Sequence, residues 1–192
     1  MIFTPNIRSA IRFAIKTHEI DQKQKRKGKD IAYLGHPLTV GLVLARAGAD
    51  EDTIVAGILH DTIEDSVAEK KVTREMIAKQ FGENVAMLVD SVTEDQKAPS
   101  WEDRKREALE HIETFSHGSV LLKSADILSN GSEIVDDYEV EGAVVFGRFH
   151  ASRKTMLEHY IRTISALLKR WPDSPLAVDL KSLAGELGAI LE

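Results

Sequence analysis

Apolar residues recur at intervals of three and four positions along most of the chain, which is the spacing of one face of an α-helix. Alternation of apolar and polar residues, the pattern of a half-buried strand, persists nowhere, and no segment repeats at a fixed period. The pattern therefore predicts an all-α fold. The expected helices cover residues 7–18, 38–47, 53–65, 73–82, 83–93, 100–115, 119–129 (ending at Asn130-Gly131) and 149–171, and Ser174-Pro175 opens a last one; Asp50, Thr73 and Ser100 are expected N-caps.

Composition places the chain among folded globular proteins. Its 192 residues are enough for one domain with a sizeable core, and 43% of them are hydrophobic while 29% are charged. No Pro-, Gly- or Ser-rich linker divides the chain, so we expect a single domain over residues 1–192. The absence of cysteine excludes disulfide bonds, thiolate zinc sites and a cysteine nucleophile.

Nothing in the sequence indicates export or membrane insertion. Arg8 and Arg12 interrupt the first apolar stretch, which argues against a signal peptide. No uncharged apolar run approaches the roughly 18 residues that a membrane span needs. We therefore expect a cytoplasmic protein with no membrane partner.

Charge is distributed unevenly along the chain. The formal net charge is −6, yet residues 1–29 hold eight Lys or Arg and two acidic residues, a local net of +6. An acidic protein with a single basic segment lacks the broad positive surface that nucleic acids require, so no nucleic-acid partner is expected. The basic segment either binds a small, highly charged anion or is a solvated loop.

One segment combines an apolar helical stripe with titratable side chains. A helical projection of residues 53–65 places the apolar side chains in one arc and four titratable side chains in the opposite arc. These four are His60, Asp61, Glu64 and Asp65. Because carboxylates this close repel one another and the segment contains no Lys or Arg, it indicates a bound cation or shared protons. Gly57 falls in the polar arc, where we expect its missing side chain to leave room for another group to approach.

Two residues outside this segment complete a possible metal site. His36 precedes Pro37 at the start of a predicted helix, and Asp126 lies in an apolar helical stretch where a buried charge needs a partner. That partner is a metal ion or Lys123, three residues earlier on the same helix. Two imidazoles and two carboxylates without sulfur suit a divalent ion such as Mn²⁺, which lowers the pKa of a bound water and so supplies a nucleophile. Other histidines, such as His18, lie outside any motif and are expected to be ordinary surface or core residues.

Five short motifs give the sequence a family resemblance. In chain order they are Arg26-Lys27-Gly28; Tyr33-Leu34-Gly35-His36-Pro37; Leu59-His60-Asp61-Thr62-Ile63-Glu64-Asp65; Phe81-Gly82 with Ser91-Val92-Thr93; and Lys123-Ser124-Ala125-Asp126 with Asn130. Together they resemble the HD-domain metal phosphohydrolases, specifically the hydrolase domain of the RelA/SpoT family and its stand-alone members, the small alarmone hydrolases. The motifs lie within residues 10–130, and the resemblance implies a single HD-type helical bundle in which residues 147–192 form a helical extension.

The resemblance implies roles for particular residues. Four residues resemble the protein ligands of a Mn²⁺ ion: His36, His60, Asp61 and Asp126. An acidic pair is implied to handle protons and to orient the attacking water: Glu64 and Asp65. Three residues are implied to contact a small nucleotide substrate: Arg26, Lys27 and Asn130. The implied reaction removes the 3′-pyrophosphate from (p)ppGpp and yields GDP or GTP and pyrophosphate.

Two positions depart from the family pattern near the last motif. Ile127 and Ser129 stand where the family usually has a basic residue and a His or Tyr. These departures leave the metal ligands intact, but they weaken the assignment of (p)ppGpp as the substrate. They keep open a hydrolase of the same chemistry that acts on another nucleotide, such as (p)ppApp or NADPH, and a non-catalytic nucleotide sensor. The intact acidic pair beside intact ligands argues against the sensor.

Overall fold

Helices follow one another along almost the whole chain. The computed structural model describes residues 3–94, 100–149 and 151–192. Over these residues no strand forms, and one isolated bridge joins Lys25 to Ala32. None of the described helices is both long enough and apolar enough to cross a bilayer. The prediction of an all-α fold is confirmed.

The helical elements differ in length and type. The α-helices are α1 (Pro5–Ala14), α2 (Gly35–Arg46), α3 (Glu51–Leu59), α4 (Thr62–Asp65), α5 (Arg74–Phe81), α6 (Glu83–Val92), α7 (Trp101–His111), α8 (His117–Glu141), α9 (Arg153–Arg170) and α10 (Ala177–Leu191). A π-helical segment, η1 (Ile15–Asp21), and three 3₁₀ segments, η2 (Ala68–Lys70), η3 (Ile112–Thr114) and η4 (Gly142–Arg148), lie between them. The predicted caps Asp50, Thr73 and Ser100 each accept a hydrogen bond from the backbone N–H three residues ahead, which satisfies a free donor at the start of α3, α5 and α7.

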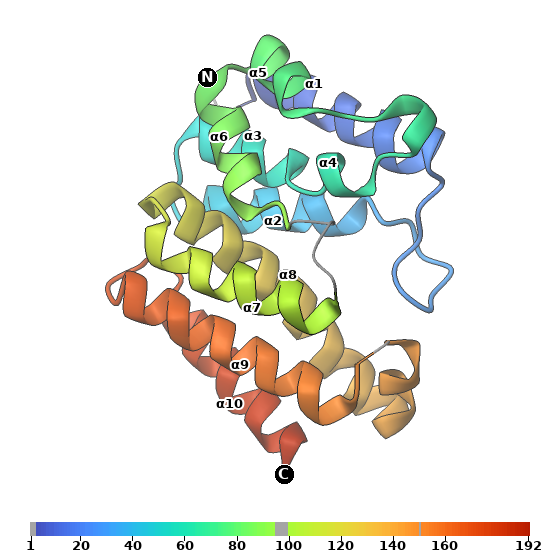
Figure 1. Ribbon diagram of the computed structural model, residues 1–192, viewed down its shortest axis with the longest axis vertical. Coiled ribbons are helices and arrows are strands. Elements are labelled where there is room, and N and C mark those ends of the chain that lie inside the picture. Colours follow the sequence, from blue (N-terminus) through green and yellow to red (C-terminus); the bar gives the residue numbers. More distant parts are fainter. Residues whose placement is uncertain (1–2, 95–99, 150) are drawn as a thin grey trace.

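Two hydrophobic clusters follow one another along the long axis of the molecule (Figure 1). The first joins α1, α2, α3, α5 and α6 to the N-terminal part of α8, and Leu44, Leu59 and Leu122 are among its fully buried members. The second joins other side chains of α8, from Val120 to Val135, to η3, η4, α9 and α10, around residues such as Leu157 and Leu167. Helix α8 thus contributes side chains to both clusters.

Two glycines allow neighbouring helices to approach closely. The predicted helix end at Asn130-Gly131 is wrong, because α8 continues to Glu141. A Cβ at Gly131 would lie 2.7 Å from Cδ2 of Leu183 in α10, so this glycine admits a packing partner and does not end the helix. The space that the missing side chain of Gly57 leaves is taken by Leu44 of α2, because a Cβ at Gly57 would lie 2.4 Å from Cδ1 of Leu44.

The helix predicted over residues 53–65 is interrupted near its C-terminal end, at the candidate site residues His60 and Asp61. Helix α3 ends at Leu59, His60 and Asp61 form a turn, and α4 begins at Thr62. The Thr62 hydroxyl donates to the Leu59 carbonyl oxygen at 2.7 Å and so satisfies one of the carbonyls that the end of the helix leaves free. The helix predicted over residues 149–171 also starts later than expected, at Arg153, the first residue of α9.

We predict that Gly57→Ala destabilises the protein although alanine favours helices. The new methyl group would overlap Leu44, which is fully buried, and overpacking of this kind costs about 1–3 kcal/mol. The matched control is Gly185→Ala in α10, where a Cβ meets nothing within 4 Å, and the helix propensity of alanine should add roughly 0.5–1 kcal/mol. Urea unfolding of both variants measures the difference; equal stability of the two variants would contradict the packing described here.

Candidate metal centre

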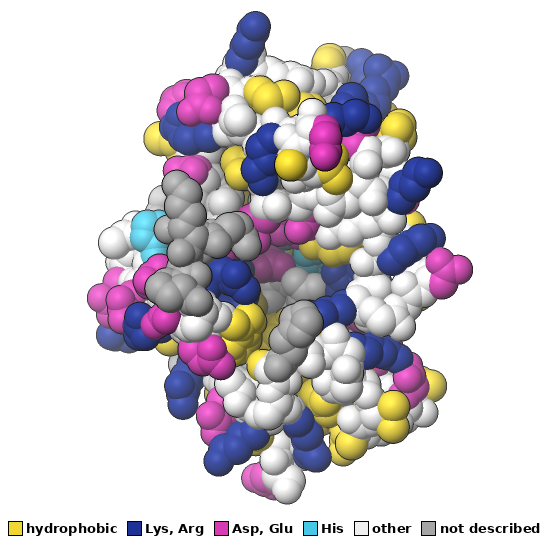
Figure 2. All heavy atoms as spheres, turned by 45° about the vertical axis from the view of Figure 1, so that its right-hand side comes forward, with side chains coloured by type: hydrophobic (Ala, Val, Ile, Leu, Met, Phe, Trp, Pro, Cys, Tyr) yellow, Lys and Arg dark blue, Asp and Glu magenta, His cyan; other side chains and the backbone are white. Residues whose placement is uncertain are grey.

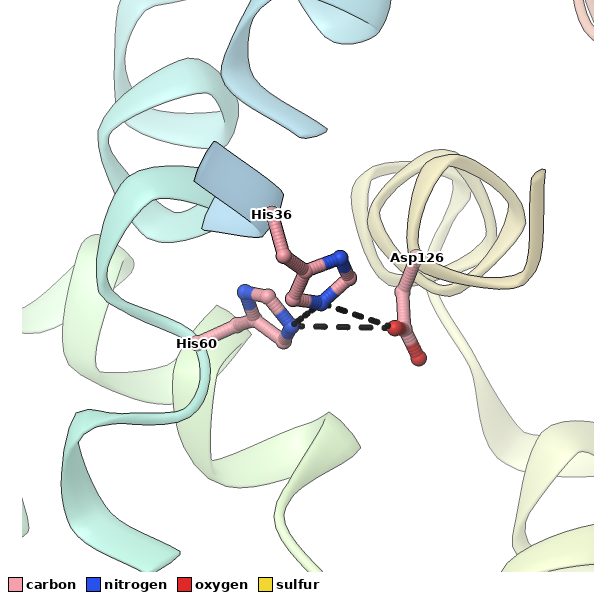
Figure 3. A group of neighbouring side chains, drawn as sticks. All are labelled: His36, His60 and Asp126. Atoms are coloured by element: carbon pink, nitrogen blue, oxygen red, sulfur yellow. Dashed lines mark hydrogen bonds and ion pairs between the residues drawn. The ribbon is translucent and has the colours of Figure 1, made fainter. Parts of the chain in front are cut away.

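Three segments that are distant in the sequence bring two imidazoles and a carboxylate together (Figure 3). His36 lies in the first turn of α2, His60 directly follows α3, and Asp126 lies within α8. All three residues are buried, and the Nε2 atoms of the two imidazoles lie 3.2 Å apart. Oδ1 of Asp126 lies 3.4 Å from Nε2 of His36 and 3.7 Å from Nε2 of His60. One ligand atom from each residue lies within 4.8 Å of the other two, a spacing at which one metal ion could bind all three.

A hydrogen bond on the far side of each imidazole determines which nitrogen faces the group. Nδ1 of His60 lies 2.8 Å from the carbonyl oxygen of Gly57. A carbonyl can only accept, so Nδ1 carries a proton and Nε2 is the nitrogen left for another proton or a metal ion. Nδ1 of His36 lies 2.9 Å from the hydroxyl of Ser129. Both rings therefore direct Nε2 toward Asp126 (Figure 3).

Asp61 supplies a second carboxylate beside the two histidines. Its Oδ2 lies 3.0 Å from Nε2 of His60 and 3.5 Å from Nε2 of His36, and the hydroxyl of Tyr33 donates to the same oxygen. The Asp61 side chain is 20% exposed, against 12% for Asp126, so it lies nearer the surface. The four residues that the sequence predicts as metal ligands thus lie side by side.

The electrostatics of the group favour a positive charge at its centre. Burial lowers the pKa of His60, but the carboxylates of Asp61 and Asp126 outweigh burial and raise that pKa well above its ordinary value. Burial raises the pKa of Asp126, but the charge of Lys123 and the imidazole hydrogen bonds outweigh it, so this carboxyl has a pKa well below its usual range. Asp126 therefore stays ionised. A proton or a metal ion between these groups relieves the repulsion among the carboxylates.

Of the two partners that the sequence left open for Asp126, a metal ion and Lys123, the structure shows the ion pair with Lys123. Its Oδ2 accepts a hydrogen bond from the ammonium of Lys123 at 2.9 Å, while Oδ1 faces the imidazoles. Oδ1 also accepts from the side-chain amide of Asn130 at 2.6 Å. The ion pair with Lys123 thus orients the carboxylate and leaves one oxygen toward the histidines.

The short helix α4 carries the predicted acidic pair. Glu64 accepts a hydrogen bond from the backbone N–H of Glu94, and Asp65 accepts one from the side-chain amide of Gln24 at 2.7 Å. Burial and the charge of Asp61 raise the pKa of Glu64 to about 7. The same two causes raise the pKa of Asp65. A carboxyl group that titrates near neutral pH is suited to proton transfer.

His18 orients the amide that holds Asp65. It is a core histidine, as expected, and is fully buried, with Nδ1 2.8 Å from Oε1 of Gln24. Because the Gln24 amide nitrogen donates to Asp65, its oxygen is the atom that faces His18, and His18 Nδ1 must donate to it. A chain of hydrogen bonds thus runs from the core to the acidic pair.

The basic segment folds against α8 next to the candidate metal group. The Arg26 guanidinium donates to Oδ1 of Asn130 at 2.7 Å and to the carboxylate of Glu133. Lys29 pairs with the same carboxylate at 2.7 Å. The side chain of Arg26 is only 13% exposed, so the alternative of a solvated loop is wrong for this residue.

A cavity of about 390 Å³ lies between the basic segment and α8. Arg26, Lys27 and Asn130 all line it, together with the aromatic side chains of Phe149 and Tyr160. The Lys27 ammonium lies over the Phe149 ring, 5.3 Å from its centroid. Figure 2 shows a hollow on one face of the molecule, with acidic and histidine side chains at its floor and Lys or Arg side chains at its margin. The three predicted nucleotide contacts therefore share one cavity.

Sequence reasoning did not identify several polar residues at this site. Tyr33 lies within a quoted motif, but nothing in its spacing indicates the hydrogen bond to Asp61. Gln24 lies two residues before Arg26 and carries no signal of its contact with Asp65. Ser129 was noted only as a departure from the family pattern.

We predict that Glu64→Gln makes the metal-free protein more stable at pH 8 and leaves its stability at pH 4 nearly unchanged. The folded protein holds the Glu64 proton up to about pH 7, whereas an exposed glutamate in the unfolded chain loses it near 4.5, so ionisation of Glu64 makes folding less favourable as pH rises through that interval. The full effect corresponds to roughly 3 kcal/mol. Urea unfolding at both pH values measures it, and an equal effect of the substitution at both would contradict the raised pKa.

Comparison with known proteins identifies similar sequences. A Xenopus tropicalis protein named guanosine-3′,5′-bis(diphosphate) 3′-pyrophosphohydrolase MESH1 is 37% identical over 126 residues, which is 65% of this chain and 66% of that protein. An Aquifex aeolicus protein named guanosine-3′,5′-bis(diphosphate) 3′-pyrophosphohydrolase is 39% identical over 126 residues, again 65% of this chain but 17% of that protein. The matched region thus spans just under two thirds of the MESH1 relative and a small part of the bacterial one.

Solved structures extend the likeness beyond the matched sequence. The structure reported for a metazoan ortholog of SpoT that hydrolyses ppGpp has a TM-score of 0.78 at 24% identity, over 98% of both chains, which is a likeness of fold. A crystal structure of a Listeria monocytogenes EGD-e protein has a TM-score of 0.72 at 31% identity, over 81% of this chain and 98% of that one. The family model described as HD domain matches residues 10–130, which contain all four clustered histidine and aspartate residues. Because this match covers well over half of the sequence, the chain belongs to the HD-domain family.

Proposed function

We propose that this protein is a divalent-metal-dependent phosphohydrolase that removes the 3′-pyrophosphate from (p)ppGpp, releasing GDP or GTP and pyrophosphate. The observation that carries the proposal is the convergence of two imidazoles and two carboxylates next to a cavity lined by basic side chains. The names of the vertebrate and bacterial relatives support the choice of substrate.

Four residues would hold the metal ion: His36, His60, Asp61 and Asp126. The donor set fits a divalent ion, because it offers two imidazole nitrogens and two carboxylates without sulfur, and both Nε2 atoms face the same point. Mn²⁺ suits this set of ligands. When bound, such an ion supplies charge neutralisation for the diphosphate and activation of water.

Glu64 and Asp65 would handle the protons of the reaction. Hydrolysis breaks the bond between the ribose O3′ and phosphorus, and water supplies the oxygen that replaces O3′. The attacking water loses a proton and O3′ gains one. In the metal-free protein burial and the charge of Asp61 raise the pKa of Glu64 to about 7, so we assign Glu64 as the proton acceptor, and Asp65, held by Gln24, is the second carboxyl of the pair.

Arg26, Lys27 and Asn130 would contact the nucleotide. The guanidinium and ammonium groups suit phosphate oxygens, which accept charge-assisted hydrogen bonds. Arg26 is paired with Glu133, so phosphates that bind Arg26 compete with this carboxylate. The Phe149 and Tyr160 rings that line the same cavity offer an apolar surface for a base.

The departures from the family pattern carry little weight against this substrate class. Ile127 is 5% exposed and packs in the second hydrophobic cluster, so its side chain does not line the cavity beside the basic segment. Ser129 contacts His36. Ser129 also lines, together with Arg26, a second cavity of about 880 Å³, so of the two departures only Ser129 shares a cavity with a proposed nucleotide contact.

The test is a substrate panel assayed with Mn²⁺ and with a chelator. We predict Mn²⁺-dependent pyrophosphate release from ppGpp, and we expect His60→Ala to lose bound metal and most turnover because a ligand is missing. His117→Ala, at an exposed position in the first turn of α8, is the matched control and should retain both.

The panel also separates the alternative functions. Release from ppApp or phosphate release from NADPH, with none from ppGpp, would move the proposal to another nucleotide. Bound metal with no turnover of any of the three would favour a nucleotide sensor.

A further inference from the structure

The hydroxyl of Ser129 lies behind the imidazole of His36, on the side away from the other ligands. The two residues come from different helices, and His36 Nδ1 and Ser129 Oγ are 2.9 Å apart. His36 is 4% exposed, so its ring is buried where it meets Ser129. On the opposite side of the ring, Nε2 faces His60 and Asp126.

We propose that Ser129 is a positioning residue for His36 in the proposed metal centre. Its hydroxyl accepts the Nδ1 proton and so leaves Nε2 unprotonated and directed at the metal position. An imidazole binds a metal through a nitrogen without a proton, and the partner of the other nitrogen determines which one that is. This inference rests on the proposed metal centre.

The two histidines differ in how they are held, which makes the role of Ser129 testable. His60 Nδ1 donates to the backbone carbonyl of Gly57, and this acceptor is present whichever residue stands at position 57. His36 depends on a side chain, which can be exchanged. Ser129 lies three residues after Asp126, so the same face of α8 carries the proposed ligand and the group that orients its neighbour.

A cavity of about 880 Å³ between α2, α8 and α10 limits the loss of metal affinity that we expect when the Ser129 hydroxyl is removed. Both His36 and Ser129 line it, and so does Ser132, an exposed residue three positions further along α8. Water entering from this cavity can partly replace the lost hydroxyl in a Ser129→Ala variant. We therefore expect the lower end of the 10- to 100-fold loss in metal affinity that removal of such orienting partners typically causes.

The first experiment is a titration of the purified metal-free proteins with Mn²⁺. Ser129→Ala should bind Mn²⁺ about tenfold more weakly than the natural chain, whereas Ser129→Thr, which keeps the hydroxyl, should stay within about twofold. Ser132→Ala is the matched control and should bind like the natural chain. Thermal unfolding of the metal-free variants separates loss of affinity from loss of fold. Equal Mn²⁺ affinity of Ser129→Ala and Ser132→Ala would overturn the proposal.

The second experiment measures the His36 ring itself without metal. A two-bond ¹H–¹⁵N NMR spectrum distinguishes a protonated Nδ1 from a protonated Nε2. We expect His36 to be protonated at Nδ1 in the natural chain and in Ser129→Thr. In Ser129→Ala we expect the spectrum of the His36 ring to change, because the acceptor of the Nδ1 proton is missing. An unchanged pattern in Ser129→Ala would overturn the role of Ser129. If the natural chain bound no Mn²⁺, the metal centre would fail as a proposal, while this spectrum would still test the hydrogen bond.

Discussion

Helix α8 must run unbroken between the two hydrophobic clusters, and the candidate site depends on this continuity. Four of its polar residues, Asp126, Ser129, Asn130 and Glu133, follow the spacing of one helical face. They contact, in turn, the histidine pair, the back of His36, the Arg26 guanidinium, and Arg26 again with Lys29. The helix can present this face because its apolar side chains are buried in both clusters.

The charges of the site are arranged around a centre that attracts a cation. Asp61 and Asp126 flank the two imidazoles, and Lys123 neutralises Asp126 from behind without occupying the oxygen that faces the histidines. The acidic pair on α4 lies beside Asp61, and it is the charge of Asp61, together with burial, that raises the pKa of Glu64. The carboxylate proposed to bind the metal ion thus also helps to raise the pKa of the group proposed to accept the proton.

The sequence was sufficient where short-range patterns determine structure. Helical periodicity and the caps Asp50, Thr73 and Ser100 predicted most elements, and the motifs around His36 and His60 predicted residues that do lie together. The sequence was insufficient where residues far apart in the chain determine where a helix ends and which side chains meet. Nothing near Gly131 reveals that Leu183 packs over it, so the helix was expected to end there and the polar face of α8 could not be recognised beyond Asn130. Ser129 and Gln24 owe their roles to partners far away in the chain.

We propose that residues from three distant segments form one divalent-cation site, and its occupancy can be observed directly. The most direct measurement is an anomalous difference map, collected at the manganese absorption edge from crystals grown with Mn²⁺. We expect a single strong peak within bonding distance of Nε2 of His36, Nε2 of His60 and the carboxylates of Asp61 and Asp126. A peak elsewhere, or none in crystals of protein saturated with Mn²⁺, would contradict it.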